Sequence, residues 1–188
     1  MELKKVTVLG AGLMGHGITQ VAAQAAKYEV YMRDIKQEFL DNGMRMISDS
    51  LQRFQKKGEM TEPEAKQVLG RIHPTLDLKE ALSDADLIIE AVTENPDLKK
   101  KVLTEADAQA KPDAIIATNT SSISISELAS ATRRPEKFAG MHFFNPPQIM
   151  KLIEIIKGAK TSDETISTIV EVSKKMGKEP VVVKKDVA

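Results

Sequence analysis

Two ionisable side chains stand in runs of apolar residues, where a lone charge is unfavourable. His142 lies near the end of the apolar run 138–144, which an Asn-Pro-Pro sequence brings to a stop. Glu154 is the one charged residue in the run 152–156. An imidazole exchanges protons near neutral pH, and a carboxylate beside it would fix its tautomer and stabilise its charged form. Together they would make a general base and its orienting acid.

Each of these residue types also has a plainer interpretation. Glu154 either pairs with His142 or points outward from an edge strand. Glu90 lies in a similar apolar run, so an acid in such a run is not catalytic by that fact alone. His16 is expected in the first turn of a helix, near solvent or phosphate, and His73, which precedes a proline, is interpreted as structural.

A polar segment, Thr118-Asn-Thr-Ser-Ser122, directly follows the apolar run 114–117. Ligands of parallel α/β sheets bind at the carboxyl ends of strands, so this segment is a candidate binding loop. Ser121 is the better candidate for a ligand contact, and the alternative is an ordinary loop. Ser122 and Ser124 are interpreted as helix caps.

The sequence Gly10-Ala-Gly-Leu-Met-Gly15 joins a predicted strand to a predicted helix. Residues 6–9 are apolar and β-branched, and from Leu13 onward the apolar residues recur at helical spacing. Gly10 permits the tight turn, Gly12 lets the backbone approach a pyrophosphate, and Gly15 lets the helix pack close to the strand. The free amides and partial positive charge at the helix start would then face the phosphates.

The context of this turn predicts a dinucleotide. A second strand ends at Asp34, nineteen residues past the last glycine of the turn. A carboxylate there accepts hydrogen bonds from ribose hydroxyls and repels a 2′-phosphate, which favours NAD over NADP. Arg33 weakens that preference, because a phosphate could recruit it.

Strand and helix patterns alternate along the whole chain. Strands are predicted near residues 4–9, 28–33, 71–74, 86–92, 114–118, 138–143, 151–157 and 180–184. Helices are predicted near residues 13–26, 36–57, 62–69, 77–83, 97–110, 124–132 and 162–176. This alternation indicates parallel strands with crossover helices, and therefore an α/β fold with a doubly wound, Rossmann-type, mostly parallel sheet.

Residues 36–69 are expected to form a helical hairpin inserted into this scheme. Gly58 follows the long first helix and is predicted to form its C-terminal cap. Thr61-Glu-Pro-Glu64 has the pattern of a capping box and should open the second helix.

The composition is that of an enzyme domain. The 188 residues suffice for a buried core, and 27 basic residues balance 27 acidic ones, so nothing favours nucleic acid or an anionic membrane. The chain has no cysteine, which excludes disulfides, thiolate metal sites and a cysteine nucleophile. We see no signal peptide or membrane span and expect a cytoplasmic protein.

Several motifs together resemble, in order and separation, the NAD-binding domain of L-3-hydroxyacyl-CoA dehydrogenases. They are Gly10 to Gly15, Glu90-Ala-Val-Thr-Glu-Asn-Pro96, Thr118 to Ser122, and Met141-His-Phe-Phe-Asn-Pro146 with the later Glu154. The resemblance covers essentially the whole chain and implies one NAD-binding domain over residues 1–188. Pro147 departs from the family, in which a valine is expected after Asn-Pro.

The resemblance implies a role for each matching residue. His142 would be the general base toward the 3-hydroxyl, Glu154 its orienting partner, and Ser121 a contact to substrate and nicotinamide. Ser50 and Lys57 would meet coenzyme A, although Lys56 and Lys57 equally suit a solvated helix end. The implied NAD contacts are Gly10, Gly12, Leu13, Met14, Gly15, Asp34, Val92, Thr93, Glu94, Lys99, Ser121 and Asn145.

The implied reaction is the reversible NAD-dependent oxidation of a (3S)-3-hydroxyacyl-CoA to the 3-ketoacyl-CoA. The family continues past residues 181–188 into a helical domain that closes the substrate cleft and forms a homodimer, and we expect this chain to lack it. The alternatives are a noncatalytic NAD-binding module and a related β-hydroxyacid dehydrogenase. The His-Phe-Phe-Asn-Pro segment disfavours the second of these.

Overall fold

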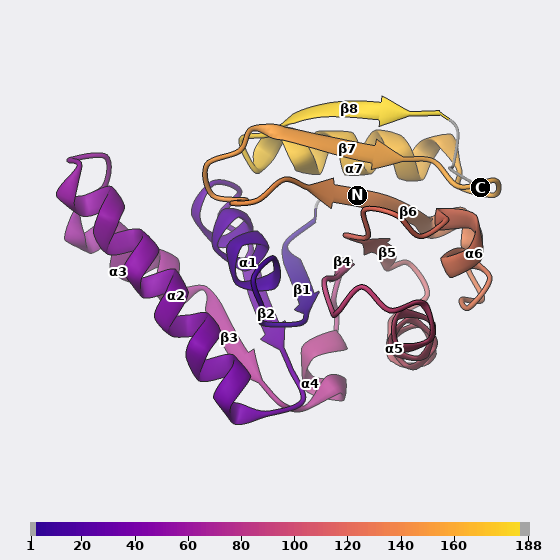
Figure 1. Cartoon of the computed structure of the whole chain (residues 1–188), viewed down its shortest axis with the longest axis horizontal. Helices are drawn as coiled ribbons and strands as arrows, with labels where there is room; N and C mark the ends of the chain where they lie inside the picture. Colours follow the sequence, from indigo (N-terminus) through magenta and orange to yellow (C-terminus); the bar gives the residue numbers. More distant parts are fainter. Residues whose placement is uncertain (1–2, 185–188) are drawn as a thin grey trace.

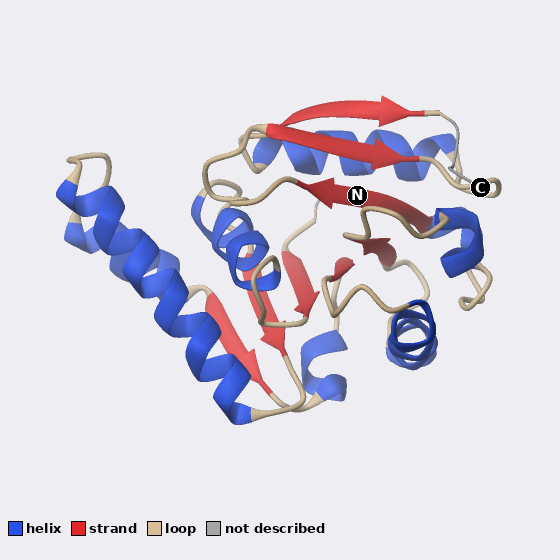
Figure 2. Ribbon diagram, viewed as in Figure 1, coloured by secondary structure: helices blue, strands red, loops and turns tan. Residues whose placement is uncertain are grey.

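The computed structural model describes residues 3–184, in which one sheet is flanked by helices (Figures 1 and 2). The strands are β1 (Lys5–Leu9), β2 (Glu29–Arg33), β3 (Ile72–Thr75), β4 (Leu87–Glu90), β5 (Ile115–Thr118), β6 (Phe138–Phe143), β7 (Leu152–Ile156) and β8 (Glu179–Val183). The helices are α1 (Gly15–Gln24), α2 (Gln37–Lys56), α3 (Glu62–Gly70), α4 (Leu78–Leu82), α5 (Pro96–Gln109), α6 (Ile125–Ala129), α7 (Asp163–Lys175) and the 3-10 turn η1 (Pro135–Lys137).

The strand order is β3-β2-β1-β4-β5-β6-β7-β8, so the chain starts in the middle of the sheet and winds outward in both directions. The prediction of a doubly wound, mostly parallel sheet is confirmed. The exceptions are β7 and β8, which run parallel to each other and in the opposite direction to β6. The segment 144–151 that joins β6 to β7 is shorter than the dozen or so residues that a parallel crossover needs. Because the strand order reverses between β1 and β4, a crevice is expected at the carboxyl ends of these two strands.

Apolar side chains on the two faces of the sheet form two cores. Val6 and Val8 of β1 pack in one core with Ile18 of α1 and Ile47 of α2. Leu9, on the other face of the same strand, belongs to a second core. That core draws on α4, α5 and α6, through Leu82, Leu103, Ala106, Ile125 and Leu128. The alternation in β1 thus places helices on both faces and holds its carboxyl end rigidly.

The helical hairpin predicted at 36–69 is present as α2 and α3, which extend along one side of the molecule (Figure 1). Gly58 adopts a φ of +73° after α2, and the amide of Glu59 donates to the carbonyl of Phe54, as in a Schellman cap. The capping box is also present, because Thr61 and Glu64 each bond the other's backbone amide. Helix α6 is shorter than the predicted 124–132 and begins after its cap, Ser124.

Candidate functional site

The glycine turn connects β1 to α1 under tight steric limits. Gly10 has a φ of +107°, and a Cβ there would lie 2.7 Å from the carbonyl oxygen of Ala91. A Cβ on Gly15 would lie 1.8 Å from the carbonyl oxygen of Gly10, so the helix can begin this close to the strand only without a side chain. Gly12, in contrast, faces open space, with no atom within 4 Å of a built Cβ. Its backbone is therefore accessible to a ligand.

Asp34 lies beside this turn at the end of β2. Its Oδ2 accepts from the amide of Ala11 at 2.7 Å, and its Oδ1 accepts from the amide of Ile35 at 2.7 Å. A cavity, here called the Asp34 cavity, is lined by these residues together with Gly12, Val92 and Thr93, among others. Asp34 and Arg33 thus both line this cavity beside the glycine turn, and the contact of Asp34 with a ribose stays a prediction.

His142 and Glu154 face each other across the antiparallel pair β6–β7. The two residues are direct partners in the register, and His142 Nδ1 lies 2.8 Å from Glu154 Oε2. Because an ionised carboxylate can only accept, Nδ1 carries the proton of this hydrogen bond, and in the neutral imidazole Nε2 has a lone pair. The ring of Phe144 lies 4.7 Å from the imidazole, centroid to centroid.

Glu154 is less buried than the sequence suggested. Its side chain is 38% exposed, whereas its neighbours Ile153 and Ile155 are fully buried on the opposite face of β7. The alternation of β7 therefore places Glu154 on the sheet face that the described helices leave partly open. The alternative of an edge strand is wrong, since β8 and not β7 ends the sheet.

A second cavity joins His142 to the glycine turn. This His142 cavity is lined by Gly12, Leu13, Met14, Ala91, Val92, Thr93, Glu94, Lys99, Asn119, Ser121, His142, Phe143, Phe144 and Asn145. It shares Gly12, Val92 and Thr93 with the Asp34 cavity, so the two adjoin. The structure thus brings nearly all of the predicted cofactor residues to one cleft at the carboxyl ends of β1, β4, β5 and β6. Gly15, which packs against Gly10, contributes only to the shape of the turn.

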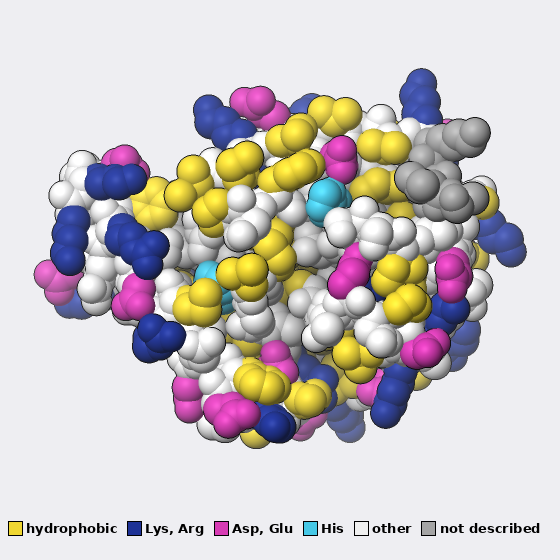
Figure 3. All heavy atoms as spheres, in the orientation of Figure 1, with side chains coloured by type: hydrophobic (Ala, Val, Ile, Leu, Met, Phe, Trp, Pro, Cys, Tyr) yellow, Lys and Arg dark blue, Asp and Glu magenta, His cyan; other side chains and the backbone are white. Residues whose placement is uncertain are grey.

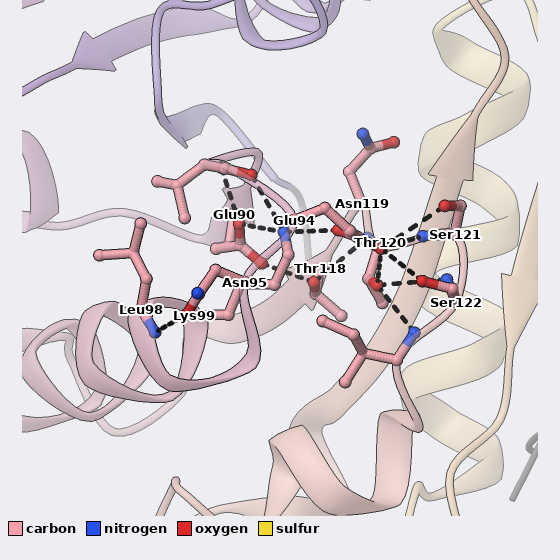
Figure 4. Close-up of polar contacts among 12 residues, drawn as sticks. Glu90, Glu94, Asn95, Leu98, Lys99, Thr118, Asn119, Thr120, Ser121 and Ser122 are labelled. Atoms are coloured by element: carbon pink, nitrogen blue, oxygen red, sulfur yellow. Dashed lines mark hydrogen bonds and ion pairs between the residues drawn. The ribbon is translucent and has the colours of Figure 1, made fainter.

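Glu94 is the centre of a hydrogen-bonded network at the edge of the His142 cavity (Figure 4). Its Oε1 accepts from the hydroxyl of Thr120 at 2.5 Å, the amide of Ser121 at 3.0 Å and the hydroxyl of Ser122 at 3.1 Å. Lys99 Nζ lies 3.3 Å from its Oε2. Partial burial opposes ionisation, but these hydrogen bonds and the ammonium outweigh it and lower the pKa of Glu94 to about 2. Glu94 is therefore an anion at neutral pH.

A groove lies between α2 and the segment after β6, and it is here called the α2 groove. Ser50 and Lys57, both predicted to meet coenzyme A, line it together with Arg45 and Arg53. Leu13 and Asn145 line both this groove and the His142 cavity, so the two are continuous. Lys57 lines the groove and Lys56 does not, so of these two lysines only Lys57 is placed to contact a ligand there.

Asn119 is a residue of the cleft that has no individual assignment from the sequence. Asn119 lines the His142 cavity, and its Oδ1 accepts from the amide of Phe143 at 2.9 Å, which ties the end of β5 to β6. His16 lies in the first turn of α1, as predicted, but it is buried, with 6% of its surface exposed. It lines the α2 groove, and burial lowers its pKa although its hydrogen bond to Gly12 acts in the opposite direction. Ser124 caps α6 as predicted, but Ser122 bonds Glu94 and is not a cap. Only the polar run after β5 could have pointed to Asn119.

His73, interpreted as structural, is hydrogen-bonded through Nε2 to Glu29 Oε2 of the neighbouring strand at 2.7 Å. Within residues 3–184, no group of three or more histidine, aspartate or glutamate side chains could hold a metal ion. None of the helices in the same range is long and apolar enough to cross a bilayer.

The sheet order, the glycine turn and the adjoining cavities define a dinucleotide-binding α/β domain. Comparison with known proteins narrows this class. The family described as "3-hydroxyacyl-CoA dehydrogenase, NAD binding domain" matches residues 5–187. The chain belongs to this family, which confirms both the fold and the expected cofactor, NAD.

Relatives of the chain carry names consistent with that family. It is 48% identical over 177 residues to "Probable 3-hydroxybutyryl-CoA dehydrogenase" of Deinococcus radiodurans, covering 94% of this chain and 62% of that protein. It is 48% identical over 182 residues to the fatty acid oxidation complex subunit alpha of Psychrobacter arcticus, covering 97% and 25%. The crystal structure of (S)-3-hydroxybutyryl-CoA dehydrogenase from Ralstonia eutropha matches with a TM-score of 0.95 at 40% identity, covering 100% and 66%. The chain therefore spans between 25% and 66% of the length of these relatives.

Proposed function

We propose that the chain is the NAD-binding part of an enzyme that interconverts (3S)-3-hydroxyacyl-CoA and 3-ketoacyl-CoA, and that His142 is its general base. The observation that carries this proposal is the 2.8 Å contact of His142 with Glu154 in a cavity that also contains the glycine turn. A module that only binds NAD has no use for an oriented imidazole there. The related enzymes named above support the same reaction class.

The residues of the cleft suit NAD. Gly12 offers an open backbone, the amides at the start of α1 offer donors for phosphates, and Asp34 offers a carboxylate to ribose hydroxyls. The residues proposed to hold it further along the cleft are Val92, Thr93, Glu94, Lys99 and Asn145. Bound NAD supplies the acceptor for the hydride that leaves C3 of the substrate.

The chain's own part in the reaction is to move and hold a proton. The Glu154 carboxylate keeps the proton of His142 on Nδ1, so Nε2 takes the proton of the 3-hydroxyl. The imidazolium that forms is stabilised by the same carboxylate, as in other His-carboxylate pairs. In the reverse direction the imidazolium returns the proton to the ketone oxygen. Ser121, in the same cavity, is proposed to donate a hydrogen bond to that oxygen.

The α2 groove is the proposed seat of the coenzyme A part of the substrate. It opens into the His142 cavity through Leu13 and Asn145, so an acyl group could reach His142 from it. Arg53 and Lys57 supply positive charge for phosphates, whereas the charge of Arg45 is partly balanced by Asp49, which also lines the groove.

Hydrophobic side chains gather over β7 and β8 on the face shown in Figure 3. Leu152 of β7 is 38% exposed, and Val181 of β8, which pairs with Glu154 in the register, is 51% exposed. The relatives are longer than this chain, and we infer that a helical domain like the one expected from the family covers this surface, closes the cleft and forms the dimer contact. The cytoplasmic location likewise stays a prediction.

The test is His142→Gln in the chain joined to the helical remainder of a relative, with acetoacetyl-CoA and NADH as substrates. We expect the turnover number to fall about 10³-fold, the size of a lost general acid-base group, while the Kd for NADH stays within about twofold. A variant that keeps full turnover would remove His142 from the mechanism. An unmutated protein that binds NADH but never turns over would favour the noncatalytic module.

A further inference from the structure

Glu90 is a buried carboxylate that the proposed reaction does not use. It is the last residue of β4, and its side chain has no exposed surface. Lys99 of α5 is 1% exposed, and its Nζ lies 2.7 Å from Glu90 Oε1. Two opposite charges held this far from water need further partners, because desolvation offsets much of their attraction.

Those partners come from the segment that follows β4 and from the end of β5 (Figure 4). The amide of Val92 donates to Glu90 Oε1 at 2.7 Å, and the hydroxyl of Thr118 donates to Oε2 at 2.6 Å. Lys99 Nζ also donates to the carbonyl of Val92 at 3.2 Å. Glu90 therefore joins the ends of β4 and β5 to helix α5, at the level of the cleft.

Lys99 passes this connection on to Glu94. Its Nζ, fixed by Glu90 on one side, lies 3.3 Å from Glu94 Oε2 on the other. The other oxygen of Glu94 accepts from the amide of Ser121 at 3.0 Å. A continuous series of charged contacts thus leads from the buried end of β4 to Ser121, which lines the His142 cavity.

We propose that Glu90 is a positioning residue that fixes Lys99 between two carboxylates, and so holds Glu94 and the Ser121 loop in place. The inference rests on the proposed function only for the part that Ser121 plays in the reaction. Without the charge of Glu90, the Lys99 ammonium has Glu94 as its one close anion and moves onto it. A shorter Lys99–Glu94 contact draws the carboxylate of Glu94 toward α5, and the hydrogen bond from the amide of Ser121 to its other oxygen, now 3.0 Å, lengthens.

Glu90→Gln in the chain as it stands tests this proposal, since the amide keeps the size of the side chain and can still bond Val92 and Thr118. Amide hydrogen exchange is the readout, because it does not depend on turnover. We expect exchange at Ser121 to rise about tenfold, and amides of β2 to change by less than about twofold. We also expect NADH to bind several-fold more weakly, since Glu94 and Lys99 line the cleft.

Glu127→Gln is the matched control. Glu127 pairs with Lys100, the next residue of α5, at 2.6 Å, but this pair lies at the surface. The control should leave both exchange at Ser121 and NADH affinity unchanged. The proposal fails if Ser121 exchanges at the same rate in Glu90→Gln as in the parent, or if β2 exchanges faster to the same extent.

The double variant Glu90→Gln/Lys99→Met separates positioning from stability. Removing both members of a buried ion pair commonly preserves folding, so the double variant should melt closer to the parent than Glu90→Gln does. Exchange at Ser121 should nevertheless stay fast, because Lys99 no longer holds Glu94. If the double variant regains both the slow exchange at Ser121 and the stability of the parent, Glu90 only stabilises the fold. The two proposals are tested separately. Turnover of the joined enzyme with His142→Gln tests the proposed function, and its outcome does not change the exchange rates on which the role of Glu90 depends.

Discussion

At the scale of single residues, Gly15 and Gly12 have different roles in the glycine turn, and adding one methyl group to each distinguishes them. Gly15 allows close packing, and Gly12 leaves the backbone open to a ligand. Gly15→Ala places a Cβ against the carbonyl of Gly10, so we expect a loss of about 1–3 kcal/mol in the free energy of unfolding, as for an overpacked core. Gly12→Ala has open space around it and should fold with little change in stability. Its methyl group covers the backbone that a pyrophosphate would approach, so NADH affinity should fall.

Urea denaturation measures the loss of stability in Gly15→Ala, and NADH fluorescence measures the loss of affinity in Gly12→Ala. A stable Gly15→Ala that binds NADH normally would contradict the packing at the turn. A Gly12→Ala that binds like the parent would show that phosphates lie elsewhere.

The residues predicted from sequence were those whose local context carried the signal. The glycine turn combined three glycines with a strand, a helix and Asp34, so each feature supported the others. His142 and Glu154 could be paired because both interrupt apolar runs. The partners of Glu90 were not predictable in this way, because Thr118 and Lys99 approach it only once β5 and α5 pack beside β4.

At the scale of elements, the position of Lys57 at the end of α2 predicts selective contact with substrate. Lys57→Gln should raise the KM for acetoacetyl-CoA about tenfold, the loss expected for one charged contact, with little change in turnover. The KM for acetoacetyl-pantetheine, which lacks the nucleotide phosphates, should not change. Steady-state kinetics of the joined enzyme with both substrates measures the difference.

Lys56→Gln is the control, because Lys56 does not line the groove. Equal effects of the two lysine variants would mean that this end of α2 attracts phosphates only through its general charge. An unchanged KM in both would place coenzyme A outside the α2 groove.

The elements themselves were predictable where the chain gives local stop signals. Thr61 and Glu64 mark the start of α3, and Gly58 marks the end of α2. The direction of β7 was not evident from the alternation of strands and helices. It depends on the absence of a helix between 144 and 151, which leaves an antiparallel return as the available connection. That return is what sets Glu154 opposite His142.

At the scale of the whole molecule, acid should unfold the protein through its paired carboxylates. Burial opposes ionisation of Asp107, but hydrogen bonds from Arg133 and Arg134 outweigh it, and the pKa of Asp107 lies below its ordinary value of 3.8. Glu94 behaves likewise, with its pKa lowered from 4.5 to about 2. A lowered pKa contributes stability above the unfolded value that is lost as the pH falls toward the folded value. Stability should therefore decline between pH 4.5 and about 2.

Asp107→Asn should remove part of this acid dependence. Asp107 is 2% exposed, so its loss leaves two arginines poorly paired, at a cost of about 2 kcal/mol at neutral pH. The difference from the parent should shrink as the pH falls, because the parent's aspartate becomes protonated. Urea denaturation as a function of pH provides the curve, and a difference that stays constant with pH would contradict this assignment.

The most direct measurement of the central claim is the nitrogen NMR spectrum of His142 in the chain and in Glu154→Gln. The 2.8 Å contact predicts that neutral His142 carries its proton on Nδ1 and has a bare Nε2, and that Glu154→Gln mixes the two tautomers. A neutral imidazole with its proton on Nε2, or a spectrum that Glu154→Gln leaves unchanged, would contradict the account of His142 as an oriented base.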